Sequence, residues 1–394
     1  MNDINFTMYK LAGIIAEYDP FHNGHAWQLQ QAKALGAQRV AVAMSCGLTQ
    51  RGALPLLPES VRVQAALTCG ADLVFALPAP YACSGAECFA RAGVQLLAAA
   101  GCDALVFGAE TPDAALLMEA ARVLSGAEYR TALKARLAAG ARSFAAARQA
   151  AVEAVCPGTG LAALLNKPNN NLAVEYCKAI LAQRSPMVPF PIRREGCYHD
   201  RTPDRENPSA TAVRRLMLEG GAWGSFVPEP ARAIFENAPL HSLAAGERAV
   251  LARLRTMTDR EFEALPYSGE GLWRKFMHAS RREATLEDIL TAVKSKRYTR
   301  TRLDRMTMCA YLGITAEILA APVPYIRVLA FNEKGRAILS AVKKSGVFRN
   351  AGETVPHPYQ SLEQRWGDLY GLFALGQPEA PGAEQRRRIV FASD

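Results

Sequence analysis

The chain has 394 residues, of which half are apolar and 21% are charged, and it carries a net charge of +9. This length exceeds what one hydrophobic core usually covers, so we expect two domains of an ordinary water-soluble protein. No apolar run approaches the roughly 20 residues that cross a bilayer, and the first residues lack the order of a secretory signal. These features argue against a membrane protein and predict a cytoplasmic one. Nine cysteines without a CxxC pair predict reduced thiols and no metal site.

The first hundred residues alternate between strand-like and helix-like segments. Apolar runs predict strands at residues 11–16, 39–44, 73–77 and 104–107, and the segments between them predict helices at 26–35, 61–67 and 86–100. Such alternation builds right-handed βαβ units, so we expect an α/β fold with a Rossmann-like parallel sheet. Ligands of such sheets bind beyond the carboxyl ends of the strands. The alanine-rich stretch 112–155 predicts a helical cap.

The first strand leads into the most informative motif of the chain. Asp19-Pro20 ends the strand, because proline cannot continue a central ladder, and His22 and His25 then flank Gly24 at the start of a helix. A helix N-terminus presents free N–H groups and a partial positive charge, and a glycine lets an anion approach the backbone. The two imidazoles can donate hydrogen bonds to nucleotide phosphates and to charge that develops on phosphorus. A pair of histidines in a surface turn is the alternative interpretation.

Later segments add candidate ligands at other strand ends. Ser45-Cys46-Gly47 and Gly108-Ala109-Glu110 follow the second and fourth strands, where each glycine alone would indicate only a turn. Residues 168–176 place three asparagines before an amphipathic helix, which is more amides than one helix cap requires. Arg193 and Arg194 add two cations at the end of a further strand. Together these segments predict one crevice at the edge of the sheet.

A second anion site is predicted where Ser209-Ala210-Thr211-Ala212-Val213-Arg214 opens a helix. A Ser or Thr at a helix start usually means only a cap. Arg214, one turn further on, adds a group suited to bidentate phosphate contact. Two phosphate sites on one Rossmann-like domain suit a triphosphate.

The basic residues gather in the second half of the chain, which is typical of a protein with a polyanionic partner. The densest run contains Lys294, Lys296, Arg297, Tyr298, Arg300 and Arg302. Cations contact phosphates, and the tyrosine or an arginine plane can stack on an unpaired base, so the run predicts an RNA contact. A solvated helix face is the alternative. The Gly- and Pro-rich stretch 220–239 predicts a linker between a nucleotide-binding domain over 1–222 and a mainly α-helical, basic domain over 240–394.

A family resemblance rests on these motifs. His22-Asn23-Gly24-His25 resembles the HxGH signature of the nucleotidylyltransferase superfamily, and the helix start at 209–214 resembles its second signature. The longer phrase from Glu17 to His25 resembles one branch of that superfamily, the bacterial tRNA(Met) cytidine acetate ligases. This resemblance extends over nearly the whole chain, including Tyr198-His199-Asp200 and residues 325–329.

The resemblance implies an ATP site made of the first strand, the HxGH motif, the second signature and a few later residues. The implied contacts are Ile15, Ala16, Glu17, Tyr18, Phe21, His22, Asn23, Gly24, His25, Gly108, Asn170, Arg193, Arg194, Ser209 and Thr211. His22, His25 and Arg214 are the implied catalytic residues, which contact phosphate in the transition state. Asn169 is the alternative to Asn170.

The resemblance also implies a ligase reaction in two steps. Acetate attacks the α-phosphate of ATP and releases pyrophosphate, and the N4 amine of the wobble cytidine in elongator tRNA(Met) then takes the acetyl group and releases AMP. Such chemistry depends on positioning and charge stabilisation more than on a nucleophilic side chain. ATP and Mg²⁺ are the implied cofactors, tRNA and acetate are the implied partners, and neither DNA nor a membrane is expected.

The sequence departs from the family pattern at four places. Asp19 replaces a usual asparagine, Cys46-Gly47 belongs to a turn that is usually Ser-Gly-Asn, Glu59 stands where lysine is common, and Arg194 replaces an aliphatic residue. We expect Cys46-Gly47 and Glu59 to lie near the crevice. Two other functions stay open: a small-molecule adenylyltransferase of the same superfamily and a non-catalytic RNA-binding relative. The basic second half argues against the former, and the intact HxGH motif argues against the latter.

Overall fold

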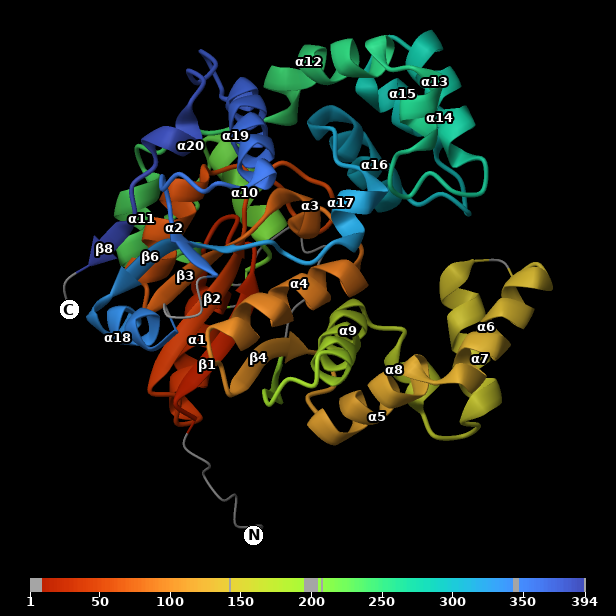
Figure 1. Ribbon diagram of the computed structural model, residues 1–394, viewed down its shortest axis with the longest axis horizontal. Helices are drawn as coiled ribbons and strands as arrows, with labels where there is room; N and C mark the ends of the chain where they lie inside the picture. The colour runs from red at the N-terminus through yellow and green to blue at the C-terminus, as the bar shows by residue number, and fades with distance from the viewer. Residues whose placement is uncertain (1–8, 142, 195–204, 207, 343–346, 393–394) are drawn as a thin grey trace.

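One mixed sheet forms the centre of the protein in a computed structural model. This structure describes residues 9–141, 143–194, 205–206, 208–342 and 347–392. The strand order is β5-β4-β1-β2-β3-β6-β7, with β8 beside β6 (Figure 1). The strands are β1 (Leu11–Ala16), β2 (Arg39–Ser45), β3 (Leu73–Leu77), β4 (Ala104–Ala109), β5 (Val188–Arg193), β6 (Ile326–Asn332), β7 (Phe348–Asn350) and β8 (Val390–Ala392). The first five are parallel, which confirms the Rossmann-like α/β prediction.

The central strands are apolar throughout because both faces of the sheet are covered. In β2, Val40 and Val42 point into one core, whereas Ala41 and Ala43 point into the other. The first of these cores is closed by helices α1, α2, α10 and α11, and the second by α4 and α9. These helices are α1 (Asn23–Ala34), α2 (Glu59–Thr68), α4 (Ala86–Ala99), α9 (Pro168–Ala182), α10 (Ala210–Glu219) and α11 (Glu229–Phe235); the short α3 (Ala79–Ala82) precedes α4. A strand that is covered on both faces has hydrophobic residues at consecutive positions along its sequence.

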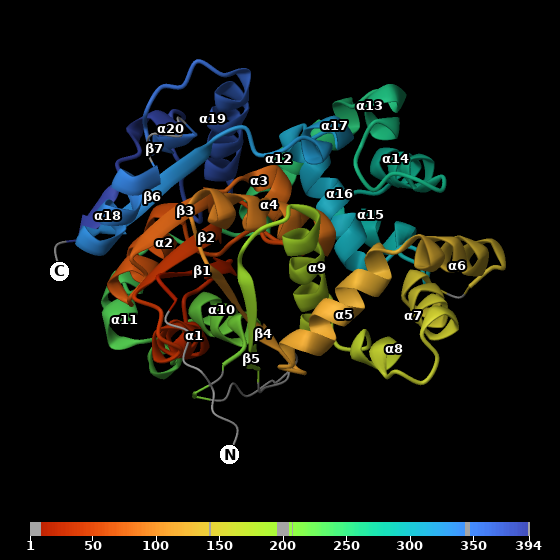
Figure 2. The same ribbon diagram turned by 60° about the horizontal axis from the view of Figure 1, so that its bottom comes forward.

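The alanine-rich stretch after β4 is helical, as predicted, and it projects from the sheet as a lobe beyond α9 (Figures 1 and 2). The lobe contains α5 (Ala114–Ser125), α6 (Ala127–Ala138), α7 (Phe144–Val155) and α8 (Leu161–Leu164). Asp113 and Ser143 cap α5 and α7 through their side-chain oxygens. The lobe joins the body where α5 packs on α9.

A second helical lobe follows α11 along the chain. It contains α12 (Leu243–Thr256), α13 (Asp259–Glu263), α14 (Leu272–Arg282), α15 (Leu286–Val293), α16 (Arg300–Leu312) and α17 (Ala316–Ala320). The stretch 220–239, predicted as a linker, is folded: it forms the 3-10 turn η1 (Gly224–Phe226) and α11, whose Ala231 and Phe235 are buried against α2. Because buried apolar residues lie between its glycines and prolines, this stretch packs against the rest of the protein and does not form an extended linker.

The last quarter of the chain returns to the sheet. β6 pairs antiparallel with β3, and β7 and β8 pair with β6. The intervening helices are α18 (Glu333–Val342), α19 (Pro358–Tyr370), η3 (Gly371–Phe373) and α20 (Ala383–Arg386). The sheet therefore takes strands from both sides of the expected domain boundary. No helix within the described residues combines the length and apolarity that crossing a bilayer requires.

Candidate active site

A cleft of about 450 Å³ opens at the carboxyl edge of β1, β4 and β5. Helices α1 and α10 both direct their N-terminal turns at it, and α9 forms a further wall. Most of the sequence-predicted site residues line this cleft: Ile15, Ala16, Glu17, Tyr18, His22, Gly24, His25, Gly108, Arg194, Ser209, Thr211 and Arg214. Helices α5–α8 contribute no lining residue, so the predicted helical cap does not cover the site.

The two histidines of the HxGH motif lie at the N-terminus of α1. His22 is the N-cap, and its backbone N–H donates to Nδ1 of His25 at 3.2 Å. That bond occupies Nδ1 of His25, so its remaining proton is on Nε2. The two rings stack with centroids 3.7 Å apart. Neither ring nitrogen of the buried His22 has a hydrogen-bond partner within the described residues, which leaves it free for a ligand.

Both imidazoles are neutral at physiological pH. Burial, followed by the positive charges of Arg194 and Arg214, lowers the pKa of His22 to about 3. Burial, followed by His22 and Arg194, lowers the pKa of His25 well below its ordinary value. Neutral imidazoles bind phosphate as hydrogen-bond donors rather than as cations.

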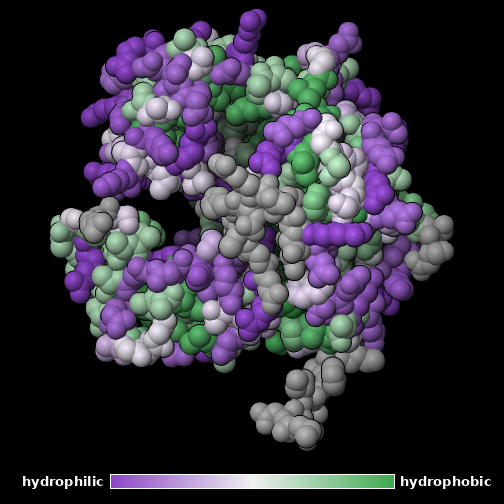
Figure 3. All heavy atoms as spheres, turned by 180° about the vertical axis from the view of Figure 1, so that it is seen from behind, coloured by the Kyte–Doolittle hydropathy of each residue, from purple (hydrophilic) through white to green (hydrophobic). Residues whose placement is uncertain are grey.

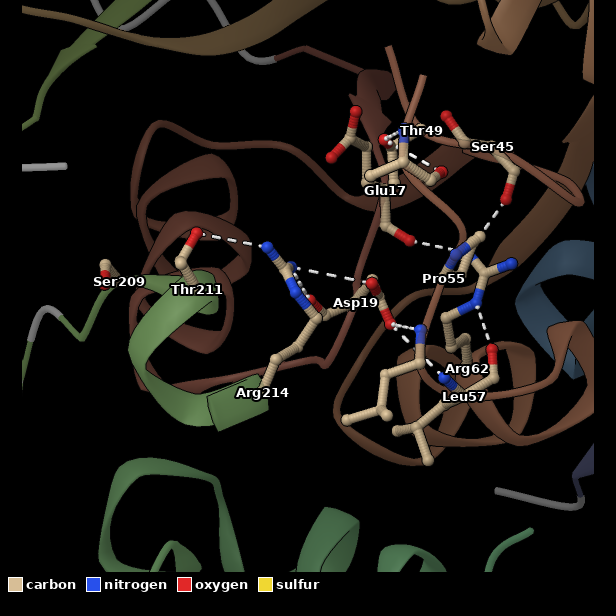
Figure 4. Close-up of polar contacts among 12 residues, drawn as sticks. Glu17, Asp19, Ser45, Thr49, Pro55, Leu57, Arg62, Ser209, Thr211 and Arg214 are labelled. Atoms are coloured by element: carbon tan, nitrogen blue, oxygen red, sulfur yellow. Dashed lines mark hydrogen bonds and ion pairs between the residues drawn. The ribbon is translucent and has the colours of Figure 1, made fainter. Parts of the chain in front are cut away.

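Arg214 faces the histidines from the first turns of α10. Its Nη1 donates to the carbonyl oxygen of Asp19 at 2.5 Å and lies 3.5 Å from the carboxylate Oδ2, while Nη2 donates to Thr211 Oγ1 at 3.1 Å (Figure 4). Ser209 caps the helix by accepting from the N–H of Ala212. Asp19 Oδ1 accepts from the backbone N–H of Leu56 at 2.9 Å. The departure from asparagine at position 19 thus supplies a negative charge that holds Arg214 at the rim.

A buried arginine that does not itself line the cleft joins the strand ends beside it. Arg62 of α2 is fully buried; its Nη1 donates to the carbonyls of Glu17 at 2.7 Å and Ser45 at 2.8 Å, and its Nε donates to Leu57 (Figure 4). It therefore ties the ends of β1 and β2 together. The Glu17 carboxylate accepts from the N–H of Gln50 at 2.7 Å, and burial raises its pKa. Sequence reasoning missed Arg62, because a lone arginine in an amphipathic helix carries no local signal.

Four predicted ATP contacts lie outside the cleft lining. Phe21 is buried against Tyr18, and Asn23 Nδ2 donates to the carbonyls of Arg205 and Ser225. Arg193 is exposed at the end of β5, and Asn170 is fully buried. The segment Tyr198-His199-Asp200, which carries part of the family resemblance, lies outside the described residues.

The adjacent asparagines of α9 have different surroundings. Asn170 Oδ1 accepts from the N–H of Thr111, and its Nδ2 donates to Thr111 Oγ1 and to the carbonyl of Leu164. Asn169 lines the cleft, where Arg194 Nη1 donates to its Oδ1 at 3.3 Å. Of the two asparagines, Asn169 is therefore the one that lines the cleft, and its Nδ2 donates to Glu110 at 2.9 Å.

The cleft also has aromatic walls that sequence reasoning did not single out. Trp27, Phe89, Phe107 and Tyr176 all line it. Trp27 is 37% exposed although it follows the HxGH motif closely. A large aromatic side chain two residues after the second histidine is the signal that could have identified this wall.

Two departures from the family pattern lie elsewhere than expected. Cys46-Gly47 and Glu59, which we expected near the crevice, line a second cavity of about 420 Å³ and are not among the residues that line the cleft. Glu59 lies 2.8 Å from Arg387 and 3.7 Å from Arg327. Burial opposes its ionisation, but Arg387 and Arg327 outweigh burial and lower its pKa. The carboxylate at position 59 therefore pairs with arginines that are far away along the chain, and no local sequence pattern reveals them.

The arginines of the basic run have acidic or carbonyl partners from other segments. Arg300 donates to both oxygens of Glu287, at 2.7 and 2.8 Å, and also pairs with Asp304. Arg297 pairs with Glu270 at 3.1 Å, and Arg302 donates to the carbonyl of Tyr267. This finding strengthens the interpretation of the run as a solvated, ion-paired face.

The remaining members of the run differ from the arginines. Lys294 and Lys296 are exposed, and their ammonium groups have no ion pair within the residues that the structure covers. The hydroxyl of Tyr298 donates to the carbonyl of Glu270 at 2.8 Å, and the ring lies beneath the guanidinium of Arg302. The two lysines are therefore the groups of this run that are accessible to phosphates.

No metal ligands are predicted from the sequence. Among the described residues no group of three or more His, Cys, Asp or Glu side chains could hold a metal ion. The two carboxylates nearest the cleft, Glu17 and Asp19, are engaged by backbone N–H groups.

A parallel sheet with a crevice between two helix N-termini, an HxGH pair and an opposed arginine defines a nucleotidyltransferase. A family model described as HIGH Nucleotidyl Transferase matches residues 9–376. The chain is 35% identical over 349 residues to the tRNA(Met) cytidine acetate ligase of Syntrophotalea carbinolica, covering 85% of this chain and 83% of the relative. It is 33% identical over 391 residues to that of Bacillus velezensis, covering 94% of each. The chain belongs to the tRNA(Met) cytidine acetate ligase family.

The fold agrees with solved structures of this family. The crystal structure of Thermotoga maritima TmcAL without ligand superposes with a TM-score of 0.89 at 28% identity, over 98% of this chain and all of that one. The same protein bound with alpha-thio ATP superposes with a TM-score of 0.87 at the same identity and coverage. The likeness therefore spans both helical lobes as well as the sheet.

Proposed function

We propose that this protein activates acetate with ATP and transfers the acetyl group to N4 of the wobble cytidine of elongator tRNA(Met) in the cytoplasm. The observation that carries the proposal is the arrangement of neutral His22 and His25 opposite Arg214, across one cleft and on two helix N-termini. Relatives named for this reaction, at 32–35% identity, support the choice of substrates.

In the first step, an acetate oxygen attacks the α-phosphorus of ATP and pyrophosphate leaves. The free N–H groups of α1 and the Nε2–H of His25 would donate to oxygens that gain charge in this displacement. Arg214 and the N-terminal turn of α10 would hold the β- and γ-phosphates. Positioning and charge stabilisation suffice here, because no covalent enzyme intermediate is required.

In the second step, the cytidine N4 amine attacks the acyl carbon of acetyl-adenylate, AMP leaves with the oxygen of acetate, and the nitrogen loses a proton. Trp27 and the other aromatic walls would exclude water from the mixed anhydride. Mg²⁺ remains an expectation from the resemblance: the triphosphate would supply its ligands, because Glu17 and Asp19 are already engaged.

The test is acetate-dependent exchange of labelled pyrophosphate into ATP, followed by mass spectrometry of the tRNA nucleosides. His25→Asn keeps an acceptor for the N–H of His22 but removes the Nε2 donor, so exchange should fall about 100- to 1,000-fold. His357→Asn is the matched control, because Nδ1 of His357 likewise accepts a backbone N–H at the start of a helix. If exchange persists in His25→Asn, His25 does not have the phosphate role assigned to it. If the wild-type protein produces no acetylated cytidine, the small-molecule or the non-catalytic alternative is favoured.

A further inference from the structure

Helices α6 and α7 form a hairpin at the outer end of the first helical lobe (Figure 1), and its tip carries exposed apolar side chains. Phe144, at the start of α7, is 59% exposed, the largest value among the large hydrophobic side chains that the structure describes. Leu137, near the end of α6, is 44% exposed. The hairpin does not use either side chain in its own core, which contains Tyr129, Ala147 and Ala151. A projecting aromatic side chain of this kind is typical of an interaction site.

The charge around this tip has one sign. Residues 129–152 contain five Lys or Arg residues and no Asp or Glu. Lys134 and Arg136 of α6 are exposed, and neither has an ion pair within the described part of the chain. They differ in this respect from Arg300, which two carboxylates neutralise. Cations without acidic partners next to an exposed aromatic ring fit a partner that carries phosphates and unpaired bases.

The hairpin also lies opposite the second helical lobe. Figures 1 and 2 both place α6 across from α14 and α15, and Figure 3 shows a notch between the two lobes. The second helical lobe also carries the turn between α15 and α16, where Lys294 and Lys296 are exposed. Exposed cations on both lobes that border the notch suit one nucleic-acid loop held between them.

We propose that the tip of the α6–α7 hairpin binds RNA, with Phe144 stacking on an unpaired base and with Lys134 and Arg136 contacting phosphates. This inference rests on the proposed function, since it assigns a second contact surface to the same tRNA. The partner is a single-stranded RNA loop rather than a duplex, because an aromatic ring stacks only on a base that has left its own stack.

The first test is Phe144→Ala, with Phe391→Ala as the matched control. Phe391 lies on β8 at the other end of the molecule and is 43% exposed. The Kd for the tRNA should rise about 5- to 140-fold in Phe144→Ala, the range that removal of one base stack produces, and should be unchanged in the control. Phe144→Trp should restore binding. Acetate-dependent pyrophosphate exchange without tRNA should stay at the wild-type level in all three variants.

The second test measures the salt dependence of tRNA binding. Replacing Lys134 and Arg136 by Gln should lower the slope of log K against log salt by about 0.7 to 0.9 for each phosphate that is no longer neutralised. Lys334→Gln, an exposed lysine on α18, should leave the slope unchanged. The inference is overturned if the Kd and the salt slope are unaltered in the hairpin variants. It is also overturned if Phe144→Ala changes the oligomeric state, because the tip would then be an interface between copies of the chain. Wild-type protein that fails the exchange assay would instead refute the proposed function.

Discussion

The buried histidine of the HxGH motif makes a quantitative prediction about acid sensitivity. Because the pKa of His22 is lower in the folded protein than in the unfolded chain, the unfolded chain binds more protons, and stability falls as pH drops below about 6.5. The pKa of His22 is 6.5 in the unfolded chain and about 3 in the folded protein. Lowering the pH from 7 to 5 therefore reduces the free energy of unfolding by about 2 kcal/mol through this residue alone. His25 adds a cost of the same sign.

The assay compares urea unfolding of the wild type and His22→Asn at pH 7 and pH 5. Titrating carboxylates affect both proteins alike, so the difference between the two pH dependences isolates the histidine. Between pH 7 and pH 5, we expect the free energy of unfolding to fall by about 2 kcal/mol less in the variant than in the wild type. Equal losses in the two proteins would contradict the reasoning, because they would mean that the imidazole is protonated as easily in the fold as in water.

Three further predictions follow from contacts around the cleft and the basic run. Arg62→Met should lower the free energy of unfolding by about 3 kcal/mol or more, measured by urea titration, because three buried carbonyls lose their donor. Asn169→Ala should raise the KM for ATP because Asn169 lines the cleft, whereas Asn170→Ala should leave the KM nearly unchanged and lower the melting temperature because a buried amide network is lost; the reverse pattern of KM values would contradict the geometry. Lys296→Gln should reduce the salt slope of tRNA binding, and Arg300→Gln should leave it nearly unchanged, because Glu287 and Asp304 already neutralise Arg300.

The features that could be predicted from the sequence are those that local pattern determines. The strand at 11–16 and the helix after His22 follow from an apolar run, a proline and a glycine within fifteen residues. The same pattern of a capping residue and a following arginine predicted the second helix N-terminus from Ser209 and Arg214, which lie five residues apart. Both helices meet at one cleft because the carboxyl ends of parallel strands share an edge.

The features that escaped prediction depend on partners far apart in the chain. Arg62 is indistinguishable in sequence from a surface arginine until the carbonyls of Glu17 and Ser45 surround it. Glu59 finds Arg387 only after β8 has returned to the sheet. The run around Arg300 contains no acid, yet Glu287 from the preceding helix neutralises it. Spacing along the chain carries no information about such contacts.

The pairing of β6 with β3 has a consequence for how the protein is made. β3 is apolar and buried on both faces, and its outer edge is covered only when Leu73 pairs with Phe331 and Val74 with Ala330. At typical rates of translation, synthesis of the intervening chain takes roughly 10 to 50 seconds. Throughout that interval the nascent protein presents an unpaired hydrophobic edge, the kind of surface on which another chain can add a strand. The ribosome-bound intermediate is therefore the state of this protein most in need of a chaperone.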